Sequence, residues 1–538
     1  MDMDEERKKG LECIDPIAPP PKEDAATPTI TTSTITTEKK DESDKDKDKD
    51  KEKDDDGKAK DKDMASKMQT RDVLEDEVFM KSLQQLPFYH GFLPREDLRV
   101  LLVNDGDYLI RVSEISTQTK REEKEKIMIK RDLILSVFEK PLFQPTTGPM
   151  EERAMEPAKD IRSEKVFDGK LRNMVVRRHN GKFGIEQHIS FDTIPELLAH
   201  YNQSNSGETK KNRILKNAIK FQSWEYYHTD IKLGNLLGEG AYGEVRSGVL
   251  KRKEKNVDVA VKLMKGGGDM NKNKIREMMK EARLMRGFKH KNVVRFYGVA
   301  VDEQPLYILL ELVKGGALNT YLQKNKKVST IDLMNMCLGA ACGLQYLHAN
   351  NCIHRDIAAR NCLYSVDRIV KLSDFGLSRI GNQYKLANAQ KLPIKWLAAE
   401  TICTLYFTSK TDVYSYGVMC FEIFSEGDEP WENITNTEAK KNVVTGKHLT
   451  IPDSCPEKWR TYLYDNVYVK EPKKRATMDD IVRYLEPLIA QCQEEKDKSS
   501  DKVKKNESKV PDRSAKKTKR RDKKKDKKKE SHPGNHNM

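Results

Sequence analysis

The 538-residue sequence lacks any long run of apolar residues. No stretch approaches the roughly 18 apolar residues that a membrane-spanning helix needs, which excludes such a helix. The N-terminal residues MDMDEERKKG contain no apolar segment, so no secretory signal is indicated. The nine cysteines form no C-x-x-C pair and lie mostly within apolar patterns, as reduced core thiols of a cytosolic protein do. These absences predict a cytoplasmic protein with no transmembrane segment.

Hydrophobic residues are also scarce, at 37% against 34% charged residues, and the shortage is concentrated near the two ends of the chain. Residues 39–63 are almost all Lys, Asp or Glu and cannot bury enough apolar surface to offset chain entropy. Residues 501–530 hold 16 Lys or Arg against 6 Asp or Glu, a net charge of +10 within the total of +14. The sequence therefore predicts a disordered low-complexity leader over residues 1–86 and a disordered basic tail over residues 492–538.

The basic tail admits several interpretations. It could bind nucleic acid, a membrane surface or an acidic partner, or direct the chain to the nucleus. It could also be a solvated segment that binds nothing. A membrane surface or an acidic partner is expected here more than nucleic acid.

The first predicted folded block covers residues 87–205. It begins with a helix at 94–103 and ends with a second helix, which follows a T-x-x-E capping box formed by Thr193 and Glu196. Apolar strands are expected between the helices, at 108–112, 133–138, 174–178 and 183–185. The order helix, strands, helix predicts a small α+β domain.

The second predicted block covers residues 231–491, after a linker over residues 206–230. Its first third has the pattern of strands, at 257–264, 293–301 and 306–313. The remainder has the pattern of helices, for example at 331–349. A strand-rich lobe followed by a helical lobe predicts a cleft between them, and clefts bind ligands.

Three glycines mark the stretch LGEGAYGEV, which starts this block. Gly238, Gly240 and Gly243 allow backbone N–H groups to approach phosphate oxygens closely. A glycine-rich hairpin without a ligand is the simpler interpretation of this pattern alone. No helix signal follows Gly243 and Val245 continues a strand, which disfavours a dinucleotide-binding turn and favours a flap over nucleotide phosphates.

Lys262 ends the apolar stretch VAVK and shares one face of the strand with Ala260. Such a lysine can simply extend its ammonium group into solvent. The stretch KEARLM offers a partner, because Glu281 lies in an apolar helical stripe and a buried carboxylate requires a cation. We therefore expect Lys262 and Glu281 to pair, which would hold the lysine against phosphate groups.

The stretch HRDIAARNCLY contains two polar residues that could carry chemistry, Asp356 and Asn361. Asp374 follows after an apolar strand, RIVKL, so a short hairpin can bring the two aspartates to one cleft. One carboxylate and one amide oxygen suit Mg²⁺, which prefers oxygen ligands. The other carboxylate would then be free to accept a proton from a hydroxyl group.

The motifs LGEGAYGEV, VAVK, KEARLM, HRDIAARN, DFG and TDVYSYG occur in the order found in eukaryotic protein kinases, and the whole second block resembles that family. The resemblance implies a bilobal fold with a β-rich N-lobe and a helical C-lobe that binds ATP and Mg²⁺. It implies that Asp356 is the catalytic base, that Asn361 and Asp374 hold Mg²⁺, and that Lys262 contacts the phosphates. The implied nucleotide-binding residues are Leu237, Gly238, Gly240, Gly243, Val245, Ala260, Lys262, the gatekeeper Leu310, and the hinge from Glu311 to Val313.

Two stretches resemble tyrosine kinases in particular. HRDIAARN has Ala358 where serine/threonine kinases commonly have Lys, and it carries Arg360 as a further catalytic-loop residue. LPIKWLAAE resembles the tyrosine-kinase platform, whose deeper pocket suits a phenol. Ala399 stands there in place of a usual proline, while Glu400 is kept and expects Arg475 as its ion-pair partner.

Tyr384 lies where such kinases carry an activating phosphotyrosine. Arg355, beside the expected base, would pair with that phosphate. An exposed loop tyrosine without such a role is the alternative. Tyr414 replaces a usual tryptophan in TDVYSYG, a change that does not touch phosphates or metal.

The stretches FYHGFLPREDL, GDYLIRVSE and LILSVFE make the first block resemble an SH2 domain, an antiparallel sheet flanked by two helices. Arg111 lies mid-strand among apolar residues and could hold a phosphate by a bidentate fork; a structural ion pair is the alternative. The implied phosphotyrosine pocket consists of Arg111, Arg95 and Ser113. Two features depart from the pattern: no histidine is present near 172–173, where strand D usually has one, and the loops 114–130 and 139–165 are long and charged.

An SH2 domain followed directly by a tyrosine kinase resembles the Fes/Fer type of non-receptor tyrosine kinase. This implies a phosphotransferase that acts on protein tyrosines, binds phosphotyrosine proteins in intracellular signalling, and is cytoplasmic, with recruitment to the plasma membrane or nuclear entry through the tail left open. A phosphotyrosine adaptor with an inactive kinase fold is the alternative. The complete set Lys262, Glu281, Asp356, Asn361 and Asp374 speaks against that alternative.

Overall fold

The computed structural model of the chain describes residues 77–117, 128–140, 169–202, 215–240, 243–264, 272–387 and 392–507. These residues belong to one compact unit, Thr70–Met538. Most of the expected leader and tail lies outside the described residues. No helix in the described ranges is both long enough and apolar enough to cross a membrane. The eight cysteines within those ranges are free thiols.

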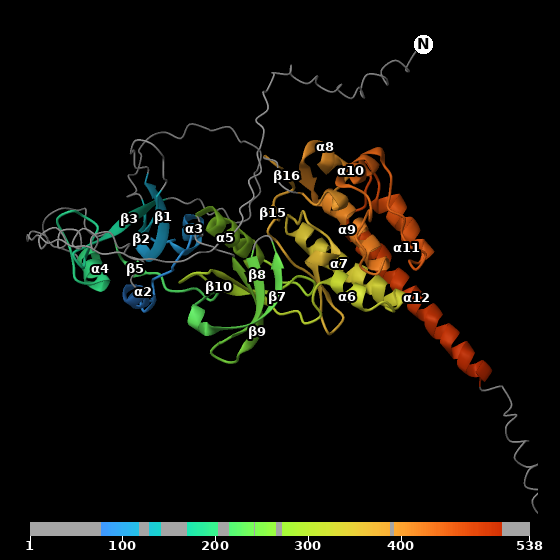
Figure 1. Ribbon diagram of the computed structural model, residues 1–538, viewed down its shortest axis with the longest axis horizontal. Helices are drawn as coiled ribbons and strands as arrows, with labels where there is room; N and C mark the ends of the chain where they lie inside the picture. The colour runs from blue at the N-terminus through green and yellow to red at the C-terminus, as the bar shows by residue number, and fades with distance from the viewer. Residues whose placement is uncertain are drawn as a thin grey trace, which may run out of the picture. The chain divides into compact units, whose positions relative to one another are not determined.

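The N-terminal block is built on a five-stranded sheet of order β4-β3-β2-β1-β5 (Figure 1). The pairs β1–β2, β2–β3 and β3–β4 are antiparallel, and the short β5 joins β1 in parallel. Side chains of three helices of this block share one hydrophobic core with the sheet, and the same core continues into the second block. The elements are α2 (Glu77–Gln84), α3 (Arg95–Leu101), β1 (Asp107–Thr117), β2 (Met128–Glu139), β3 (Lys170–His179), β4 (Lys182–Gly184), α4 (Ile194–Asn202) and β5 (Asn217–Ala218).

Helix α2 belongs to this block, so the expected leader boundary at residue 86 is wrong. Phe79 and Leu83 lie four residues apart on one face of the helix, and both are buried in the core. The Phe79 ring stacks on Phe183 of β4, with 5.2 Å between ring centroids. The helix is short and follows a charged segment, which is why composition alone does not reveal it.

The second block begins with a six-stranded sheet of order β6-β10-β11-β9-β8-β7. Helix α5 packs against β10 of this sheet. The strand expected at 257–264 is β9, whereas those expected at 293–301 and 306–313 are shorter. The elements are β6 (Glu225–Tyr226), β7 (Ile231–Gly240), β8 (Gly243–Leu250), β9 (Val257–Met264), α5 (Lys272–Arg286), β10 (Phe296–Ala300) and β11 (Tyr307–Glu311).

The segment expected to be a linker takes part in both sheets. β5 pairs with β1 of the first sheet, and β6 pairs in parallel with β10 of the second. The prediction of a separate linker over residues 206–230 is therefore wrong for residues 215–230. Strands of two residues have no periodic pattern that a sequence could show.

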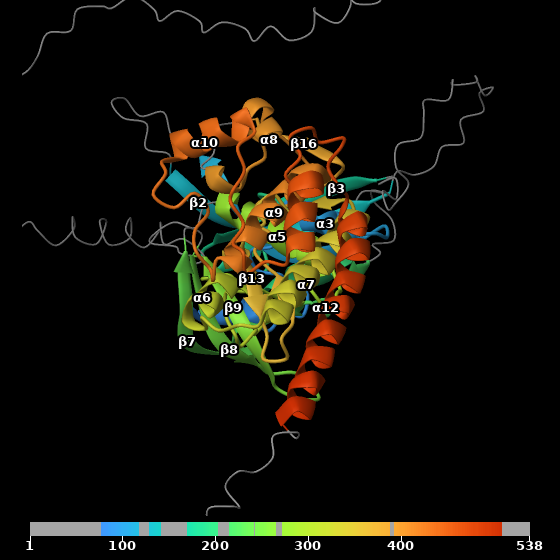
Figure 2. The ribbon, with the colours of Figure 1, turned by 90° about the vertical axis from the view of Figure 1, so that its right-hand side faces the viewer.

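The rest of the second block is mainly helical, so the expected bilobal fold is present. Helices α7, α9 and α12 lie side by side in two views at right angles (Figures 1 and 2), and α7 contacts both of the others. The elements are α6 (Leu318–Lys324), α7 (Thr330–Ala349), β12 (Cys352–Ile353), β13 (Cys362–Tyr364), β14 (Val370–Leu372), β15 (Arg379–Ile380), β16 (Gln383–Lys385), α8 (Ala399–Thr404), β17 (Tyr406–Thr408), α9 (Ser409–Phe424), α10 (Asn436–Thr445), α11 (Glu457–Tyr462) and α12 (Met478–Glu507).

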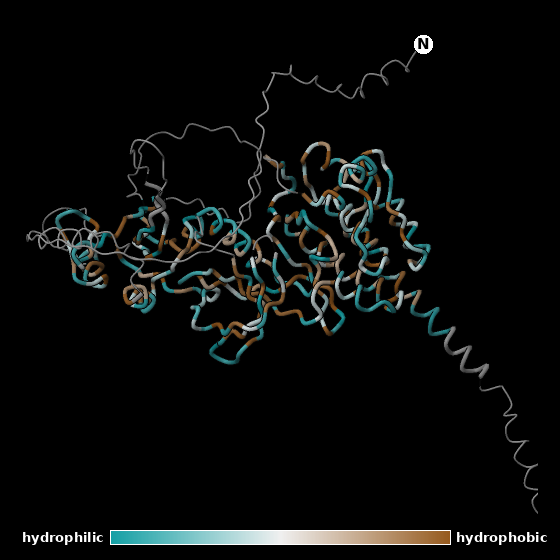
Figure 3. The backbone as a smooth tube through the Cα atoms, viewed as in Figure 1, coloured by the Kyte–Doolittle hydropathy of each residue, from teal (hydrophilic) through white to brown (hydrophobic). Residues whose placement is uncertain are grey.

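Helix α12 continues well past residue 491, where the disordered tail was expected to begin. Its first half is buried through Ile481, Leu485 and Leu488, and the coloured part of the helix where it leaves the core is hydrophilic (Figure 3). Good helix formers fill the outer end, and Lys498 lies 3.4 Å from Glu494 in an i,i+4 ion pair. The tail prediction is therefore wrong for residues 492–507, because charged composition permits a helix as well as disorder.

Candidate active site

Lys262 on β9 and Glu281 on α5 form a buried ion pair. The lysine Nζ lies 2.9 Å from both carboxylate oxygens of Glu281 and 3.5 Å from Oδ1 of Asp374. Burial alone would lower the pKa of Lys262, but attraction to Glu281 and Asp374 outweighs it, so the pKa is raised. The expected pair is therefore present and fixes a cation beside Asp374.

The strand register gathers the expected nucleotide-binding residues around this lysine. Leu237 lies on β7, Glu311 closes β11, and Val313 follows two residues later. The register gives the pairs Gly240–Gly243, Gly238–Val245, Val245–Lys262 and Ala260–Leu310. The glycine-rich stretch is thus a hairpin whose second strand, β8, pairs with β9, the strand that carries Lys262. A flap over nucleotide phosphates requires this arrangement.

The turn that carries Asp356 is held from beneath by Asp412 of α9. The Asp412 carboxylate accepts hydrogen bonds from the backbone N–H groups of His354 and Arg355, at 2.7 and 2.8 Å. Arg355 has φ +73°, a left-handed conformation that is uncommon outside glycine. Two charge-assisted hydrogen bonds to a buried carboxylate explain how the turn keeps this conformation.

Asp356 faces a cation of its own loop. Arg360 Nη2 lies 2.5 Å from Asp356 Oδ1, and the Arg360 guanidinium stands 4.2 Å from the centroid of the Trp396 ring. The Asp356 carbonyl oxygen accepts a hydrogen bond of 2.8 Å from Asn361 Nδ2. The loop therefore fixes both the backbone and one carboxylate oxygen of Asp356.

The residues expected to hold Mg²⁺ meet at the hairpin of β13 and β14. Asn361 lies just before β13 and Asp374 two residues after β14, and Ser373 joins them by donating its N–H and hydroxyl to the Asn361 carbonyl oxygen, at 2.9 and 2.8 Å. The Asn361 amide nitrogen is used by Asp356, so the amide oxygen is the atom available to a ligand. One amide oxygen and one carboxylate fit Mg²⁺, which commonly takes few protein ligands beside phosphates and water. The described residues contain no cluster of three or more His, Cys, Asp or Glu that would form a separate metal cage.

Arg355 lies against the ring of Tyr384. Its guanidinium stands 4.4 Å from the Tyr384 ring centroid and 4.3 Å from that of Phe407, because β16 pairs with β17. Burial, together with repulsion from Arg379, lowers the pKa of Arg355 to about 10. Within the described ranges, Arg355 Nε and Nη2 are buried without a hydrogen-bond partner. Two donors are thus available to an anion beside Tyr384.

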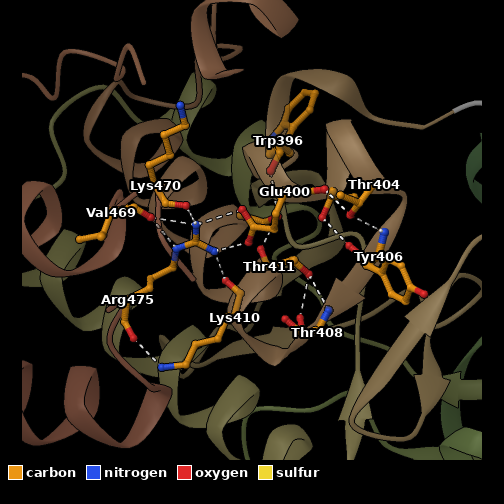
Figure 4. A network of polar contacts seen from close by, with 12 residues as sticks. Trp396, Glu400, Thr404, Tyr406, Thr408, Lys410, Thr411, Val469, Lys470 and Arg475 are labelled. Atoms are coloured by element: carbon orange, nitrogen blue, oxygen red, sulfur yellow. Dashed lines mark hydrogen bonds and ion pairs between the residues drawn. The ribbon is translucent and has the colours of Figure 1, made fainter. Parts of the chain in front are cut away.

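The expected pair of Glu400 and Arg475 is present in the helical lobe (Figure 4). Arg475 Nη1 and Nη2 lie 2.7 and 3.2 Å from the Glu400 carboxylate oxygens, and the same guanidinium donates to carbonyl oxygens of Lys410 and Val469. The guanidinium also stands 5.3 Å from the Tyr414 ring centroid, so tyrosine preserves an aromatic neighbour at this position.

A second candidate site surrounds Arg111 in the N-terminal block. A cavity of about 1170 Å³ is lined by Arg95, Arg111, Ser113, Lys170 and Asn173, among others, so the structure brings the three expected residues together. Arg111 is only 5% exposed, and burial lowers its pKa to about 10. It donates to the neutral oxygens of Ser136, Leu93 and Asn173, at 3.1, 3.4 and 3.1 Å. Among the described residues no carboxylate forms an ion pair with it, which argues against the structural ion pair.

Sequence reasoning missed four polar residues of these sites: Asp412, Ser136, Asn173 and Glu422. Asp412 and Glu422 lie on the apolar helix α9, where a buried acid signals a partner without identifying it. Ser136 and Asn173 share a hydrogen bond of 2.8 Å and both accept from Arg111. Asn173 is one of the two positions, 172 and 173, near which the expected SH2 pattern has a histidine.

The chain is similar to known protein kinases. A family model described as protein tyrosine and serine/threonine kinase matches residues 231–485. The chain is 32% identical to tyrosine-protein kinase Fer of Mus musculus over 427 residues, 78% of this chain and 46% of that protein. It is 32% identical to Fer-related kinase 1 of Caenorhabditis elegans over 407 residues, 75% of this chain and 94% of that protein. The chain thus spans less than half the length of the mouse Fer kinase and nearly all of the nematode kinase.

Proposed function

Because this chain belongs to the Fes/Fer type of non-receptor tyrosine kinases, we propose that it transfers the γ-phosphate of ATP to tyrosine hydroxyls of proteins. The observation that carries this proposal is the connected set of charges in the site. Lys262 pairs with Glu281 and also lies beside Asp374. Asn361 donates a hydrogen bond to the backbone of Asp356 and accepts one from Ser373, the residue before Asp374.

Asp356 acts as the general base in this proposal. Arg360 holds one of its carboxylate oxygens at 2.5 Å, and the other is left to accept the proton of a substrate hydroxyl. The fixed backbone around Asp356 orients the hydroxyl oxygen for attack on the γ-phosphate in line with the leaving group. General-base help of this kind typically contributes about 10²–10⁴-fold to a rate.

Lys262 stabilises the charge on the phosphates. Its ammonium group is kept protonated by Glu281, and its strand β9 pairs with β8 of the glycine-rich hairpin. Asn361 and Asp374 would hold Mg²⁺, which neutralises phosphate charge when bound. Positioning and electrostatic stabilisation thus supply most of the acceleration, as the loose transition state of phosphoryl transfer requires.

Tyrosine as the acceptor is supported by the platform around Trp396. Arg360 lies between Asp356 and the Trp396 ring, a different arrangement from a lysine two residues after the base. Phosphorylation of Tyr384 would place a dianion beside the unpartnered donors of Arg355, which would tie β16 to the turn that carries Asp356 and raise activity.

The N-terminal block is proposed to act as an SH2 domain that recruits the enzyme to phosphotyrosine proteins. The buried Arg111, with neutral partners and a wide cavity in front of it, supports this role. The proposed setting is intracellular signalling in the cytoplasm, and the basic tail is proposed to contact a membrane surface or an acidic partner.

The test of this function is turnover of Asp356→Asn. The variant keeps the shape of the side chain but loses the basic oxygen, so kcat should fall by roughly 10²–10⁴-fold while the affinity for ATP is kept. Asp367→Asn, the same change at an exposed turn between β13 and β14, is the matched control. Equal turnover of Asp356→Asn and Asp367→Asn would contradict the assignment.

A further inference from the structure

A buried acid beneath the catalytic loop has no part in the mechanism above. Glu422 lies in the last turn of α9 and is 3% exposed. Its Oε2 accepts a hydrogen bond from the backbone N–H of Ala359, at 2.8 Å, and another from the indole Nε1–H of Trp396, at 3.1 Å. One oxygen atom therefore joins the catalytic loop to the platform at the end of the activation segment, two stretches that are far apart in the sequence.

Both hydrogen bonds lead to the proposed base. Ala359 directly precedes Arg360, and the Trp396 ring is the surface on which the Arg360 guanidinium stacks, at 4.2 Å. Arg360 in turn lies 2.5 Å from Asp356 Oδ1. Arg360 Nη1 is buried without a partner among the described residues, so stacking on Trp396 is a main restraint on where the guanidinium lies.

From this geometry we propose that Glu422 is a positioning residue for the base. Its carboxylate fixes Trp396 and the backbone at Ala359, and these hold the Arg360–Asp356 pair in the orientation needed for transfer. Glu422 reaches neither the nucleotide residues nor the Lys262–Glu281 pair, so it should act on turnover and on the protein substrate but not on ATP. The inference rests on the proposed kinase activity.

The charge of Glu422 matters, because a carboxylate accepts two hydrogen bonds more strongly than a neutral acid does. Burial raises the pKa of Glu422 to about 7, against the lowering effect of the two hydrogen bonds and of Arg360. The titratable groups that face it are Arg360 and Asp356 on the catalytic loop and the buried Cys362 thiol on β13. The carboxylate is therefore lost as the pH falls through about 7.

The test compares wild type with Glu422→Gln, whose side chain has the same shape and mimics the protonated acid. At about pH 8, where wild-type Glu422 is ionised, kcat of the variant should be roughly tenfold lower, with KM for ATP within about twofold of wild type. At about pH 6 the ratio of the two kcat values should approach one, because both side chains are then neutral. Groups common to both proteins cancel in this ratio. Glu426→Gln, the same change at an exposed position, should match wild type at both pH values.

Trp396→Phe gives a second, independent variant, which removes the indole N–H and keeps an aromatic ring under Arg360. If Glu422 acts through that N–H, adding Glu422→Gln to Trp396→Phe should lower kcat by much less than tenfold. A pH-independent ratio between wild type and Glu422→Gln, or full multiplication of the two losses, would overturn the inference and leave Glu422 a residue of structural importance only.

One readout does not depend on activity. The chain has four tryptophans, so the indole N–H signal of Trp396 can be identified in an NMR spectrum as the one that Trp396→Phe removes. In wild type this signal should shift with a midpoint near pH 7, and in Glu422→Gln it should not. Absence of wild-type turnover would contradict the proposed function, whereas an indole signal that does not titrate would contradict the contact itself.

Discussion

Replacing Arg111 by methionine should stabilise the free protein and abolish its binding of phosphotyrosine. Arg111 is 5% exposed, and burial with repulsion from Arg95 lowers its pKa from 12.5 to about 10. At about 1.4 kcal/mol for each tenfold change in acidity, the folded protein holds this cation about 3 kcal/mol less favourably than water does. Methionine fills a similar volume without charge, and Ser136 and Asn173 still bond each other at 2.8 Å.

The expected gain in unfolding free energy for Arg111→Met is therefore about 1–3 kcal/mol, after allowance for the hydrogen bonds that Arg111 gives up. Loss of the bidentate contact with a phosphate should lower the affinity for a phosphotyrosine peptide by more than about a hundredfold. A functional site that costs stability until its ligand arrives would show both effects together.

The assay is urea or thermal unfolding with and without a phosphotyrosine peptide. In wild type the peptide should raise Tm, and in Arg111→Met the starting Tm should be higher and the peptide should have no effect. Arg172→Met is the matched control, because Arg172 lies on the neighbouring strand β3, is 47% exposed and pairs with Glu139. A variant at position 111 that is less stable than the one at 172, or that still responds to the peptide, would refute this reasoning.

Two further predictions concern buried residues outside the candidate sites. His228 Nδ1 forms an ion pair with the Asp302 carboxylate, and Nε2 lies 2.8 Å from the Pro305 carbonyl oxygen. Burial would lower the pKa of His228, but the attraction of Asp302 outweighs burial and raises it. A histidine whose pKa is raised on folding stabilises the protein fully below its unfolded pKa of about 6.5, and this stabilisation is lost as the pH rises through the folded pKa. The unfolding free energy that His228→Gln removes should therefore be largest at about pH 6 and should shrink above the folded pKa. A difference that does not depend on pH would count against the charged pair. Leu83→Ala in α2 should lower the unfolding free energy by about 3 kcal/mol in urea denaturation, against little change for the exposed Lys81→Ala, and equal effects would show that α2 is not part of the core.

The elements that carry the site were predictable because local pattern and chemistry agree there. β9 has the predicted bounds, and the pairing of Lys262 with Glu281 follows from one rule, that a carboxylate in an apolar helical stripe needs a cation. The hairpin that connects Asn361 to Asp374 follows from an apolar strand of suitable length between them. Where local sequence pattern and chemistry agree in this way, the predicted element is the one that forms in the fold.

The parts that were not predicted depend on contacts between distant residues. Asp412 and Glu422 are acids on a buried helix, and nothing near them in the sequence shows that they hold the turn at His354 and the N–H of Ala359. The two-residue strands β5 and β6 arise only because neighbouring strands offer free edges. Helix α2 and the outer half of α12 were not predicted because charged residues surround them, and composition does not separate a solvated helix from a disordered segment.

The central claim, that Asp356 serves transfer to tyrosine, is tested most directly by identifying the phosphorylated residue. Purified chain would be incubated with ATP, Mg²⁺ and a random polymer of glutamate and tyrosine, beside Asp356→Asn. The account predicts phosphotyrosine from the wild type and almost none from the variant, with ATP bound by both. Absence of phosphotyrosine from a wild-type protein that binds ATP and is already phosphorylated on Tyr384 would contradict it.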